Sequence, residues 1–538
     1  MVLIYQVVLQ KTDRYTWRYQ KTKNDRKGGK KMNGGKRTFK VKADGPSVKI
    51  HNFWNNIHFH PTDAIEDNWG QRILDQVSRD HVAQYVRIYA MLEDIVGRTD
   101  DGRLNFFFDE IDQRIDYLIA KGFRLLICFN FLPTVLAANP ESISAFPRYK
   151  GKRINTSEPA DYEEWEKVCY ALTEHLLKRY GEERMGQWYF HCWNEPDLPG
   201  YFMSDTDRTC DMAKVTAAYC KLYDHFAKGV KTACNRVKIG GPSAALSNEL
   251  IRGFLTHVRQ GGKIDFLSIH TYGTFPVNLE KGELVGVENT YHRVQELKKL
   301  AEDCGFPNIE IIVDEWGLST EGFTCAQQCP SLEFRNTELY ASAYAHLINT
   351  YTRRKAPVSK QMICLSGQHN LEKDFHGYRS FFTLSGFPKP IYNAYALAAK
   401  LGENLLESTG FDSGSEIGFF PTRADNGNII LMIYRFHPEQ KKSVAPQHVR
   451  LEVEGLCGKY KILHYRIDHE NCNAYTAWCE RGRKPHSSQI ECEEIMASGK
   501  LKLWYPEEIE EINGKWEMDV LMTENAVSLL ELIRQNDN

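Results

Sequence analysis

The sequence predicts an α/β protein: a (β/α)8 TIM barrel with an accessory C-terminal antiparallel β-sandwich domain. Three observations support this fold class. Apolar strand candidates alternate with stretches of helical period over residues 47–405. Two of the apolar runs stop abruptly at a carboxylate, which is Glu195 in one and Glu315 in the other. Past Leu401-Gly402 the segments become short and alternating, which is typical of antiparallel strands.

The barrel prediction rests on eight runs of bulky apolar and β-branched residues. Such runs indicate strands that are buried on both faces, as in a parallel sheet. Eight strands joined by helical crossovers is the number that closes into a barrel. We expect these strands at Val48–Phe59, Gln84–Ala90, Phe123–Phe131, Trp188–Asn194, Val237–Gly240, Ile264–His270, Ile309–Glu315 and Gln361–Gly367.

Helical periodicity between the strands is clearest in two stretches. In Asp109–Lys121 four apolar residues fall on one helical face, and Gly122 follows as a stop. Asp161-Tyr-Glu-Glu164 opens a second helix with a capping-box-like pair, and Gly181 ends it. The apolar faces carry Ile111, Ile115, Leu118 and Ile119 in the first helix and Trp165, Val168, Leu172 and Leu176 in the second.

The segments on either side of the barrel have a different character. Residues 1–37 read as a basic, disordered arm or leader, and the alternation in Phe39-Lys-Val-Lys predicts that 38–46 hold a strand that joins the sandwich. We assign 47–405 to the catalytic barrel and 406–538 to the β-sandwich domain. Strand candidates there are Asn428–Tyr434, His448–Val453, Gly458–His464 and Ala526–Leu532.

Composition and charge are those of a globular protein. Apolar residues make up 42% and charged residues 26% of the 538, and the net charge is −2. Residues 11–42, however, hold thirteen Lys and Arg against two Asp. Such an arm could bind nucleic acid or an anionic surface. A solvated tail, a vector-encoded leader or an early start codon explains it more simply, so we expect no nucleic-acid partner.

Targeting signals and metal motifs are not evident. The opening ten residues lack the flanks of a secretory signal, and no run approaches the ~18 apolar residues of a membrane span. We therefore expect a cytoplasmic protein without membrane contact. Whether the protein forms a homo-oligomer stays open. Cys325 and Cys329 are close in sequence but lack a partner pair at zinc-finger spacing. We predict no metal and no cofactor, and a reversible disulfide there stays open.

The two glutamates carry the functional prediction. In a parallel barrel the carboxyl ends of the strands form the catalytic face, so Glu195 and Glu315 can point into one pocket. A single buried glutamate could be a structural salt-bridge partner, but two at the ends of different strands favour catalysis. Glycoside hydrolysis needs one carboxylic acid to protonate the leaving oxygen and a second carboxylate to attack or to activate water. Flanking tryptophans, Trp193 and Trp316, offer indole faces on which sugars pack.

Four motifs in this order resemble glycoside hydrolase family 39, in a clan of retaining (β/α)8 glycosidases that includes β-xylosidases and α-L-iduronidases. They are Trp193-Asn-Glu-Pro-Asp197, Gly240-Gly-Pro-Ser243, Asp265-Phe-Leu-Ser-Ile-His-Thr-Tyr272 and Asp314-Glu-Trp-Gly317. The resemblance extends over most of residues 38–402. The Asn-Glu-Pro signature alone is shared across the clan, whereas the ordered set is specific to the family.

The resemblance implies that Glu195 is the general acid/base and Glu315 the nucleophile. A nucleophile must stay ionised, so it needs donors and positive charge nearby, whereas the acid must hold its proton near neutral pH. We expect the two carboxyl groups ~5–5.5 Å apart, as retention requires. Substrate-binding positions are assigned to Asn194 (for the sugar 2-OH), His270, Tyr272, Arg87, Trp316, Phe131 and His58.

Three loops depart from the xylosidase pattern. The eighth strand ends Cys364-Leu-Ser-Gly-Gln-His369, where xylosidases usually carry an aromatic residue. The second ends Arg87-Ile-Tyr-Ala, where they have a histidine two residues after the arginine, and the first-strand loop reads Ile57-His-Phe-His-Pro61. These loops form the subsites, so the catalytic pair is better supported than the substrate.

The functional prediction is a retaining, exo-acting glycoside hydrolase that cleaves oligosaccharides or glycosides by double displacement, β-xylosidase-like in its substrate. Alternatives are an α-L-iduronidase-like enzyme, an α-L-arabinosidase or another glycosidase of the family, and a transglycosylase with the same residues. An alternative of another class is a non-catalytic carbohydrate-binding barrel, which retention of both glutamates disfavours.

Overall fold

The structure is a computed structural model that describes residues 37–59, 68–144, 154–203, 211–274, 286–322, 324–365, 373–411, 415–439, 443–484 and 487–535. Within them, Thr38 onwards forms one compact unit. The predicted basic arm lies outside the described residues except for Arg37. No helix in the described segments is both long and apolar enough to cross a bilayer.

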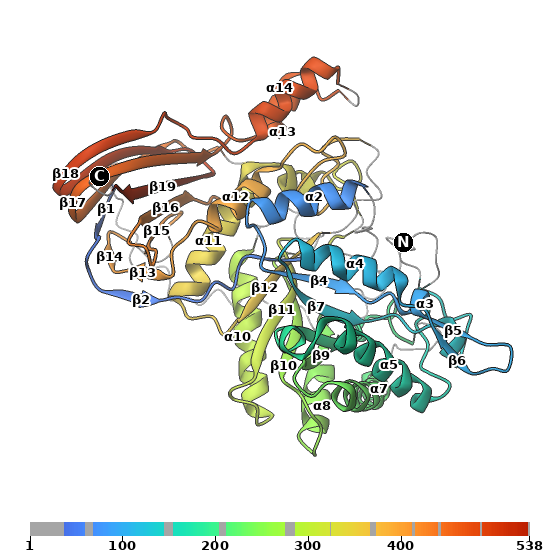
Figure 1. The fold of residues 1–538 in the computed structure, drawn as a ribbon. Helices are drawn as coiled ribbons and strands as arrows, with labels where there is room; N and C mark the ends of the chain where they lie inside the picture. The colour runs from blue at the N-terminus through green and yellow to red at the C-terminus, as the bar shows by residue number, and fades with distance from the viewer. Residues whose placement is uncertain are drawn as a thin grey trace. The chain divides into compact units, whose positions relative to one another are not determined.

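A closed barrel of eight parallel strands lies at the centre of the fold (Figure 1), which confirms the predicted barrel. Each strand pairs in parallel with the next along the chain, and the last pairs with the first. The strands are β3 (Asn56–Phe59), β4 (Tyr85–Tyr89), β7 (Arg124–Phe129), β8 (Tyr189–Cys192), β9 (Lys238–Ala244), β10 (Phe266–Tyr272), β11 (Glu310–Gly317) and β12 (Lys360–Leu365).

The first predicted strand, Val48–Phe59, divides into two. Only β3 belongs to the barrel, whereas β2 (Ser47–Lys49) pairs antiparallel with β13 (Asn404–Leu406) in the accessory sheet. The chain between them turns so that Trp54 packs behind the barrel, where its indole N–H donates to the carbonyl of Ala398 at 3.3 Å. One apolar run therefore serves two different sheets.

Helices cover the outside of the barrel, one after each strand. Two of their ends follow the predicted signals: Gly122 and Gly181 have φ values of 84° and 80°, and the Asp161 side chain caps its helix by accepting from the Glu163 N–H at 2.8 Å. The covering helices are α2 (Asn68–Arg79), α4 (Asp109–Ala120), α5 (Tyr162–Tyr180), α7 (Met212–Ala233), α8 (Asn248–Val258), α10 (Val287–Asp303), α11 (Glu338–Arg353) and α12 (Pro390–Ala398).

Shorter elements occupy the connections. They are α3 (Leu92–Ile95), the hairpin of β5 (Val96–Arg98) and β6 (Leu104–Phe106), the 3-10 turns η2 (Thr134–Leu136) and η4 (Pro330–Asn336), and α6 (Glu182–Met185).

The inward-facing side chains of the strands form two layers along the barrel axis, an apolar layer and, nearer the carboxyl ends of the strands, a polar one. The apolar layer consists of Tyr85, Leu126, Tyr189, Phe266, Ile312 and Met362. Because alternate residues of a strand share a face, the side chains two positions further on point inward one layer closer to the carboxyl ends. Those side chains are Arg87, Cys128, His191, Ser268, Asp314 and Cys364, all buried. The barrel is thus packed below and polar at the face where such enzymes place their chemistry.

An antiparallel sheet forms the accessory domain. Its hydrogen-bonded order is β14 (Ser408–Thr409), β1 (Arg37–Lys42), β17 (Gln447–Ile467), β19 (Ala526–Arg534), β16 (Ile429–Arg435), β15 (Ile417–Arg423), β13 and β2, with β18 (Glu508–Met522) beside β17. One face of β16 carries Leu431 into the core of the sandwich, and the other carries Met432 into the core shared with the barrel. The accessory domain therefore packs on the barrel helices through one face of its sheet.

Two helices interrupt the accessory domain, which the strand-rich pattern did not predict. They are α13 (Ala474–Glu480) and α14 (Gln489–Gly499), in the connection from β17 to β18. A capping box begins α14, because Ser488 accepts from the Glu491 N–H and Glu491 from the Ser488 N–H. Apolar side chains of both helices pack against Phe375 and Phe387 in the loop after β12. They support that loop from outside the barrel.

A half-buried carboxylate closes the amino-terminal end of the barrel. Glu310, at the start of β11, lies 2.9 Å from the Lys360 ammonium and 3.1 Å from that of Lys238, and it accepts from the Tyr189 hydroxyl at 2.9 Å. Burial raises the pKa of Glu310, but the charge of Lys360 and hydrogen bonds outweigh burial and lower it to about 2. This cluster ties strands β8, β9, β11 and β12 together on the face opposite the polar layer.

We predict that Glu310→Gln lowers the free energy of unfolding at pH 7 by about 2–3 kcal/mol, because two lysines lose their counter-charge. The stabilisation from a carboxylate with a lowered pKa is present above its unfolded pKa and is lost as pH falls through the folded value. Denaturant unfolding of the wild type and of Glu310→Gln should therefore show a difference in the free energy of unfolding that narrows as the pH falls from about 4.5 to about 2. Glu302→Gln, on the exposed face of α10, is the control and should change little. A difference in the free energy of unfolding that does not change with pH would contradict the explanation that the ionised Glu310 carboxylate stabilises the fold.

Candidate active site

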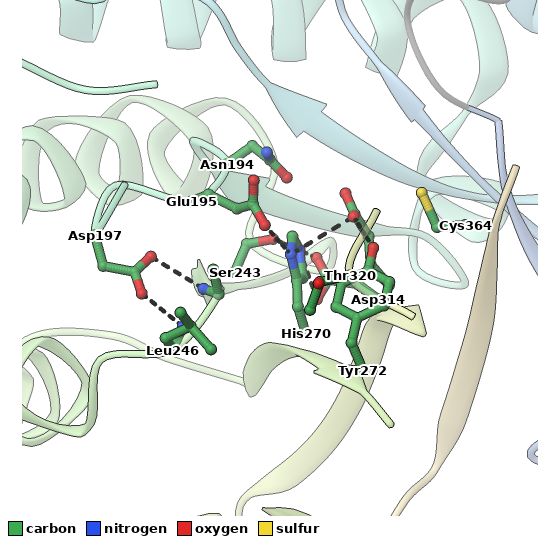
Figure 2. A network of polar contacts seen from close by, with 12 residues as sticks. Asn194, Glu195, Asp197, Ser243, Leu246, His270, Tyr272, Asp314, Thr320 and Cys364 are labelled. Atoms are coloured by element: carbon green, nitrogen blue, oxygen red, sulfur yellow. Dashed lines mark hydrogen bonds and ion pairs between the residues drawn. The ribbon is translucent and has the colours of Figure 1, made fainter. Parts of the chain in front are cut away.

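Glu195 follows β8 in a turn that the neighbouring strand holds in place. Trp193 and Glu195 both adopt left-handed backbone, with φ of 67° and 49°, which is costly for such side chains and persists only where surroundings enforce it. The Glu195 N–H donates to the carbonyl of Ser243, near the end of β9, at 3.0 Å. Asp197 accepts three backbone N–H bonds from Ala245–Ser247 at 2.7–3.0 Å. Figure 2 shows the one from Leu246. The loops after β8 and β9 are thereby locked together.

Glu315 lies near the end of β11, where an extra residue disturbs the strand pairing. Ile269 of β10 pairs with Val313, but the next residue, His270, pairs with Glu315, so Asp314 is inserted between two register positions. In a regular strand Asp314 and Glu315 would face opposite sides of the sheet. Here both carboxylates contact the same guanidinium, that of Arg87.

Donors surround Glu315 on both carboxylate oxygens. Arg87 Nη1 donates to Oε1 at 2.7 Å, and the Tyr272 hydroxyl donates to Oε2 at 2.7 Å. His58 Nδ1 lies 3.3 Å from Oε1. A carboxylate that accepts several bonds from charged and neutral donors is strongly stabilised in its ionised form.

Arg87 connects most of the polar layer. It is wholly buried, and Nη2 donates to Asn194 Oδ1 at 2.6 Å and to Ser243 Oγ at 3.1 Å. Its Nε lies 3.3 Å from Asp314 Oδ2. Because Oδ1 of Asn194 is used by Arg87, the amide NH2 group is the donor that Asn194 can offer to a ligand. One guanidinium thus orients side chains from the ends of three strands, β8, β9 and β11.

His270 lies between the two glutamates. Its Nδ1 is 2.8 Å from Glu195 Oε1, and its Nε2 is 3.0 Å from Ser243 Oγ (Figure 2). The same Nδ1 is 3.6 Å from Glu315 Oε2. Ser243 Oγ in turn donates to Asp314 Oδ2 at 2.5 Å. An oxygen of Glu195 and an oxygen of Glu315 approach within 4.8 Å. That spacing is below the ~6.5–9.5 Å of inverting enzymes and fits the shorter separation of retaining ones.

The environments of the two glutamates move their pKa values in opposite directions. Burial raises the pKa of Glu195, and the nearby charge of Glu315 adds to that effect. Burial also raises the pKa of Glu315, but the charges of His270 and Arg87 and the bond from His58 outweigh it and bring the pKa well below the usual range. Glu195 therefore keeps its proton to a higher pH than Glu315 does, which is the order of ionisation that acid-assisted nucleophilic attack requires.

The two histidines differ in charge. Burial lowers the pKa of His270, but Glu315, Asp314 and Glu195 outweigh burial and raise it to about 10, so the imidazole is a cation at neutral pH. Burial and the adjacent Arg87 lower the pKa of His58 to about 4, so that ring is neutral. His270 therefore acts as a charged donor, whereas His58 can offer Glu315 only a neutral N–H.

The structure brings seven of the nine predicted site residues into one cluster: Glu195, Glu315, Asn194, His270, Tyr272, Arg87 and His58. Phe131 lies at its edge among aromatic rings, edge-on to Trp193 with centroids 6.1 Å apart. Trp316 does not join the cluster. It is 1% exposed and stacks on Tyr344 of α11, with its N–H donating to the Tyr395 hydroxyl. Trp193 is also wholly buried, so neither indole offers a free face to a sugar.

Three residues of the cluster were not predicted as site residues. Asp314 and Ser243 stand inside quoted motifs, and the signal that could have identified them was a polar residue at an inward-facing strand position. Arg379, from the loop after β12, donates to the Tyr272 hydroxyl at 2.9 Å. No strand pattern surrounds it, so only tertiary contact reveals it. Of the predicted subsite loops, residues 60–61 and 366–369 lie outside the described residues.

Two sets of side chains in the described residues lie close enough to share a cation: His58, Glu315 and Cys364, and Glu195, His270 and Glu315. Both include Glu315, whose Oε1 already binds Arg87. The second also needs His270, which carries a proton instead of a free lone pair at neutral pH. The donor set therefore suits proton transfer better than metal binding. Cys325 and Cys329 are both buried.

The comparisons agree with the geometry. The sequence profile of glycosyl hydrolases family 39 matches residues 37–509. A β-xylosidase from Caldicellulosiruptor saccharolyticus is 26% identical over 476 residues, which cover 84% of this chain and 90% of the relative. A β-xylosidase from Geobacillus stearothermophilus is 25% identical over 471 residues, covering 84% and 87%.

A solved structure shows the same fold. A monomeric β-xylosidase from Caulobacter crescentus CB15 superposes with a TM-score of 0.78 at 22% identity, over 93% of this chain and all of that one. The family match spans both the barrel and most of the accessory domain. The chain belongs to glycosyl hydrolases family 39 and is a retaining glycosidase, as its motifs predicted.

Proposed function

We propose that the protein is an exo-acting, β-xylosidase-like glycosidase in which Glu315 is the nucleophile and Glu195 the general acid/base. The observation that carries the proposal is the asymmetry of the two carboxyl groups. They approach within 4.8 Å, yet Glu315 accepts from Arg87 and Tyr272, whereas His270 is the only side chain of the described residues that holds Glu195.

In the first step Glu195 protonates the leaving oxygen while Glu315 attacks the anomeric carbon, so the glycosidic bond breaks as an ester bond forms. The bond from His270 Nδ1 occupies Glu195 Oε1. The other oxygen of Glu195 is then the one that carries the acidic proton toward the leaving group. The donors on Glu315 fix its orientation before attack and keep the carboxylate ionised.

In the second step the roles follow from the change in charge. Once Glu315 is esterified, its negative charge no longer raises the pKa of Glu195, so Glu195 can remain ionised and accept a proton from water. Water then attacks the anomeric carbon and the ester bond breaks. The Asn194 amide, held by Arg87, donates to the sugar 2-OH, an interaction that strengthens in the transition state.

The substrate assignment rests on the similarity to β-xylosidases over most of the chain. The loops after β3, β10 and β12, which contribute to subsites in barrels of this kind, include residues 60–67, 275–285 and 366–372, outside the described part of the chain. An α-L-iduronidase-like or α-L-arabinosidase activity therefore stays the alternative within the same mechanism.

We predict that Glu315→Ala lowers kcat by on the order of 10³-fold or more, because no carboxylate remains to attack. Azide should restore turnover of activated aryl glycosides and yield a glycosyl azide of inverted anomeric configuration, identified by NMR. Glu302→Ala, an exposed glutamate on α10, is the control and should retain activity. Near-normal turnover in the Glu315 variant would remove this residue from the mechanism.

Glu195→Ala should affect substrates according to their leaving groups. For alkyl glycosides and disaccharides we expect a loss of about 10²–10⁴-fold in kcat/KM, since their leaving oxygens need protonation. For dinitrophenyl glycosides the loss in kcat/KM should be small, because that leaving group departs as an anion. Initial rates on a series of aryl leaving groups measure the difference, and equal losses across the series would refute the acid assignment.

The sugar is tested with a panel of aryl β-D-xylosides, α-L-arabinosides, β-D-glucosides, β-D-galactosides and α-L-iduronides. We expect the highest kcat/KM on the β-D-xyloside. A preference for the iduronide or the arabinoside would replace the substrate assignment while leaving the roles of Glu195 and Glu315 intact.

A further inference from the structure

Arg379 is a buried arginine whose five N–H groups all have protein acceptors. It lies in the loop after β12 and is 7% exposed. Nε donates to the carbonyl of Glu321 at 3.0 Å, and Nη2 donates to the carbonyls of Ser319, at 3.1 Å, and Thr320. These three carbonyls belong to the loop after β11, so the backbone fixes two sides of the guanidinium.

The third side of the guanidinium faces the site. Nη1 donates to the Tyr272 hydroxyl at 2.9 Å and approaches Cys364 Sγ at 3.4 Å, and the guanidinium carbon lies 4.5 Å from the centre of the Tyr272 ring. With every donor occupied, Arg379 is built to hold its neighbours in place instead of to receive a ligand.

This contact decides where the single proton of Tyr272 points. A phenol has one O–H donor, and its oxygen also accepts. Arg379 can only donate, so it occupies the acceptor side of the Tyr272 oxygen. The proton is then free to go to Glu315 Oε2, 2.7 Å away. A cation bound to the oxygen also polarises the O–H bond and strengthens the bond that Tyr272 donates.

We propose that Arg379 is a positioning residue that acts on Glu315 through Tyr272, by orienting the phenol proton toward the carboxylate and strengthening that hydrogen bond. The proposal rests on the assignment of Glu315 as nucleophile. Several other ionisable groups also face Glu315: Arg87 and His58 from β4 and β3, His270 from β10, Cys364 from β12, Glu195 after β8 and Asp314 beside it.

The chain contains a matched control for a purely structural role. Arg335 is also buried, and it donates to the same Glu321 carbonyl and to that of Gly377, at 3.2 Å for the latter. It supports the same loop as Arg379 and its charge also acts on Tyr272, but within the described residues its guanidinium donates to the carbonyls of Glu321 and Gly377 and not to the Tyr272 hydroxyl. A variant of Arg335 therefore reports what weakening the loop does without changing the donor to the phenol.

The experiment measures kcat/KM against pH for the full chain, because the acidic limb reports the ionisation of the nucleophile in the free enzyme. We expect Arg379→Gln to move this limb to higher pH by about 0.5–1 unit and to lower the plateau by on the order of ten-fold. Tyr272→Phe should move the limb at least as far. In the double variant the limb should stay where Tyr272→Phe alone puts it, since the path through the phenol is already gone.

Arg335→Gln should lower the melting temperature without moving the limb. If Arg379→Gln does not fold, Arg379→Lys is the second variant. It keeps a cation beside the phenol but loses the guanidinium hydrogen bonds to the carbonyls of the loop after β11. We therefore expect an acidic limb near that of the wild type and a lower melting temperature.

An unmoved limb in the Arg379 variants, an equal shift in Arg335→Gln, or additive shifts in the double variant would each overturn the proposal. Such results would leave the proposed function standing as long as Glu315→Ala remains inactive and is rescued by azide. Activity retained in Glu315→Ala would instead overturn the proposed function.

Discussion

The buried guanidinium of Arg87 is the interaction on which the site depends. Leaving Asp314 or Glu315 ionised and unpaired inside the barrel would cost many kcal/mol, so each must find a compensating charge. Arg87 contacts both, and His270 supplies the second cation. These two cations are shared among three carboxyl groups, because His270 also contacts Glu195. At Glu195 burial and the charge of Glu315 outweigh the effect of His270, which is the physical reason that the pKa of Glu195 is raised.

Backbone irregularity is what lets the strands deliver these groups. The register shift between β10 and β11 allows Asp314 and Glu315, adjacent in sequence, to reach one guanidinium. A comparable shift between β9 and β10 inserts Ser243, whose hydroxyl connects Asp314 with His270. Bulges next to active sites re-aim side chains in this way. The enzyme gains its dense cluster of polar groups through departures from regular pairing at the carboxyl ends of neighbouring strands.

Stability and chemistry are separated along the barrel axis. The Glu310 cluster closes the amino-terminal end, and an apolar layer that includes Phe266 and Ile312 fills the interior between that cluster and the catalytic groups. The accessory domain adds support from outside, because its helices α13 and α14 pack on Phe375 and Phe387 in the same loop that carries Arg379. The loop after β12 is therefore held from both sides, by the accessory helices and by the carbonyls of the loop after β11.

The sequence by itself determined the fold class, the eight barrel strands and the family. It also marked most residues of the site, because buried parallel strands and the polar residues at their ends leave local patterns. It could not predict that Trp193 and Trp316 are buried, since an indole beside a glutamate packs equally well against a sugar or against the outer helices. Nor could it reveal Arg379, α13 or α14, which depend on contacts between distant segments. Only the tertiary structure decided which carboxyl group is stabilised as an anion, because that depends on donors from β3, β4 and β10 converging on Glu315.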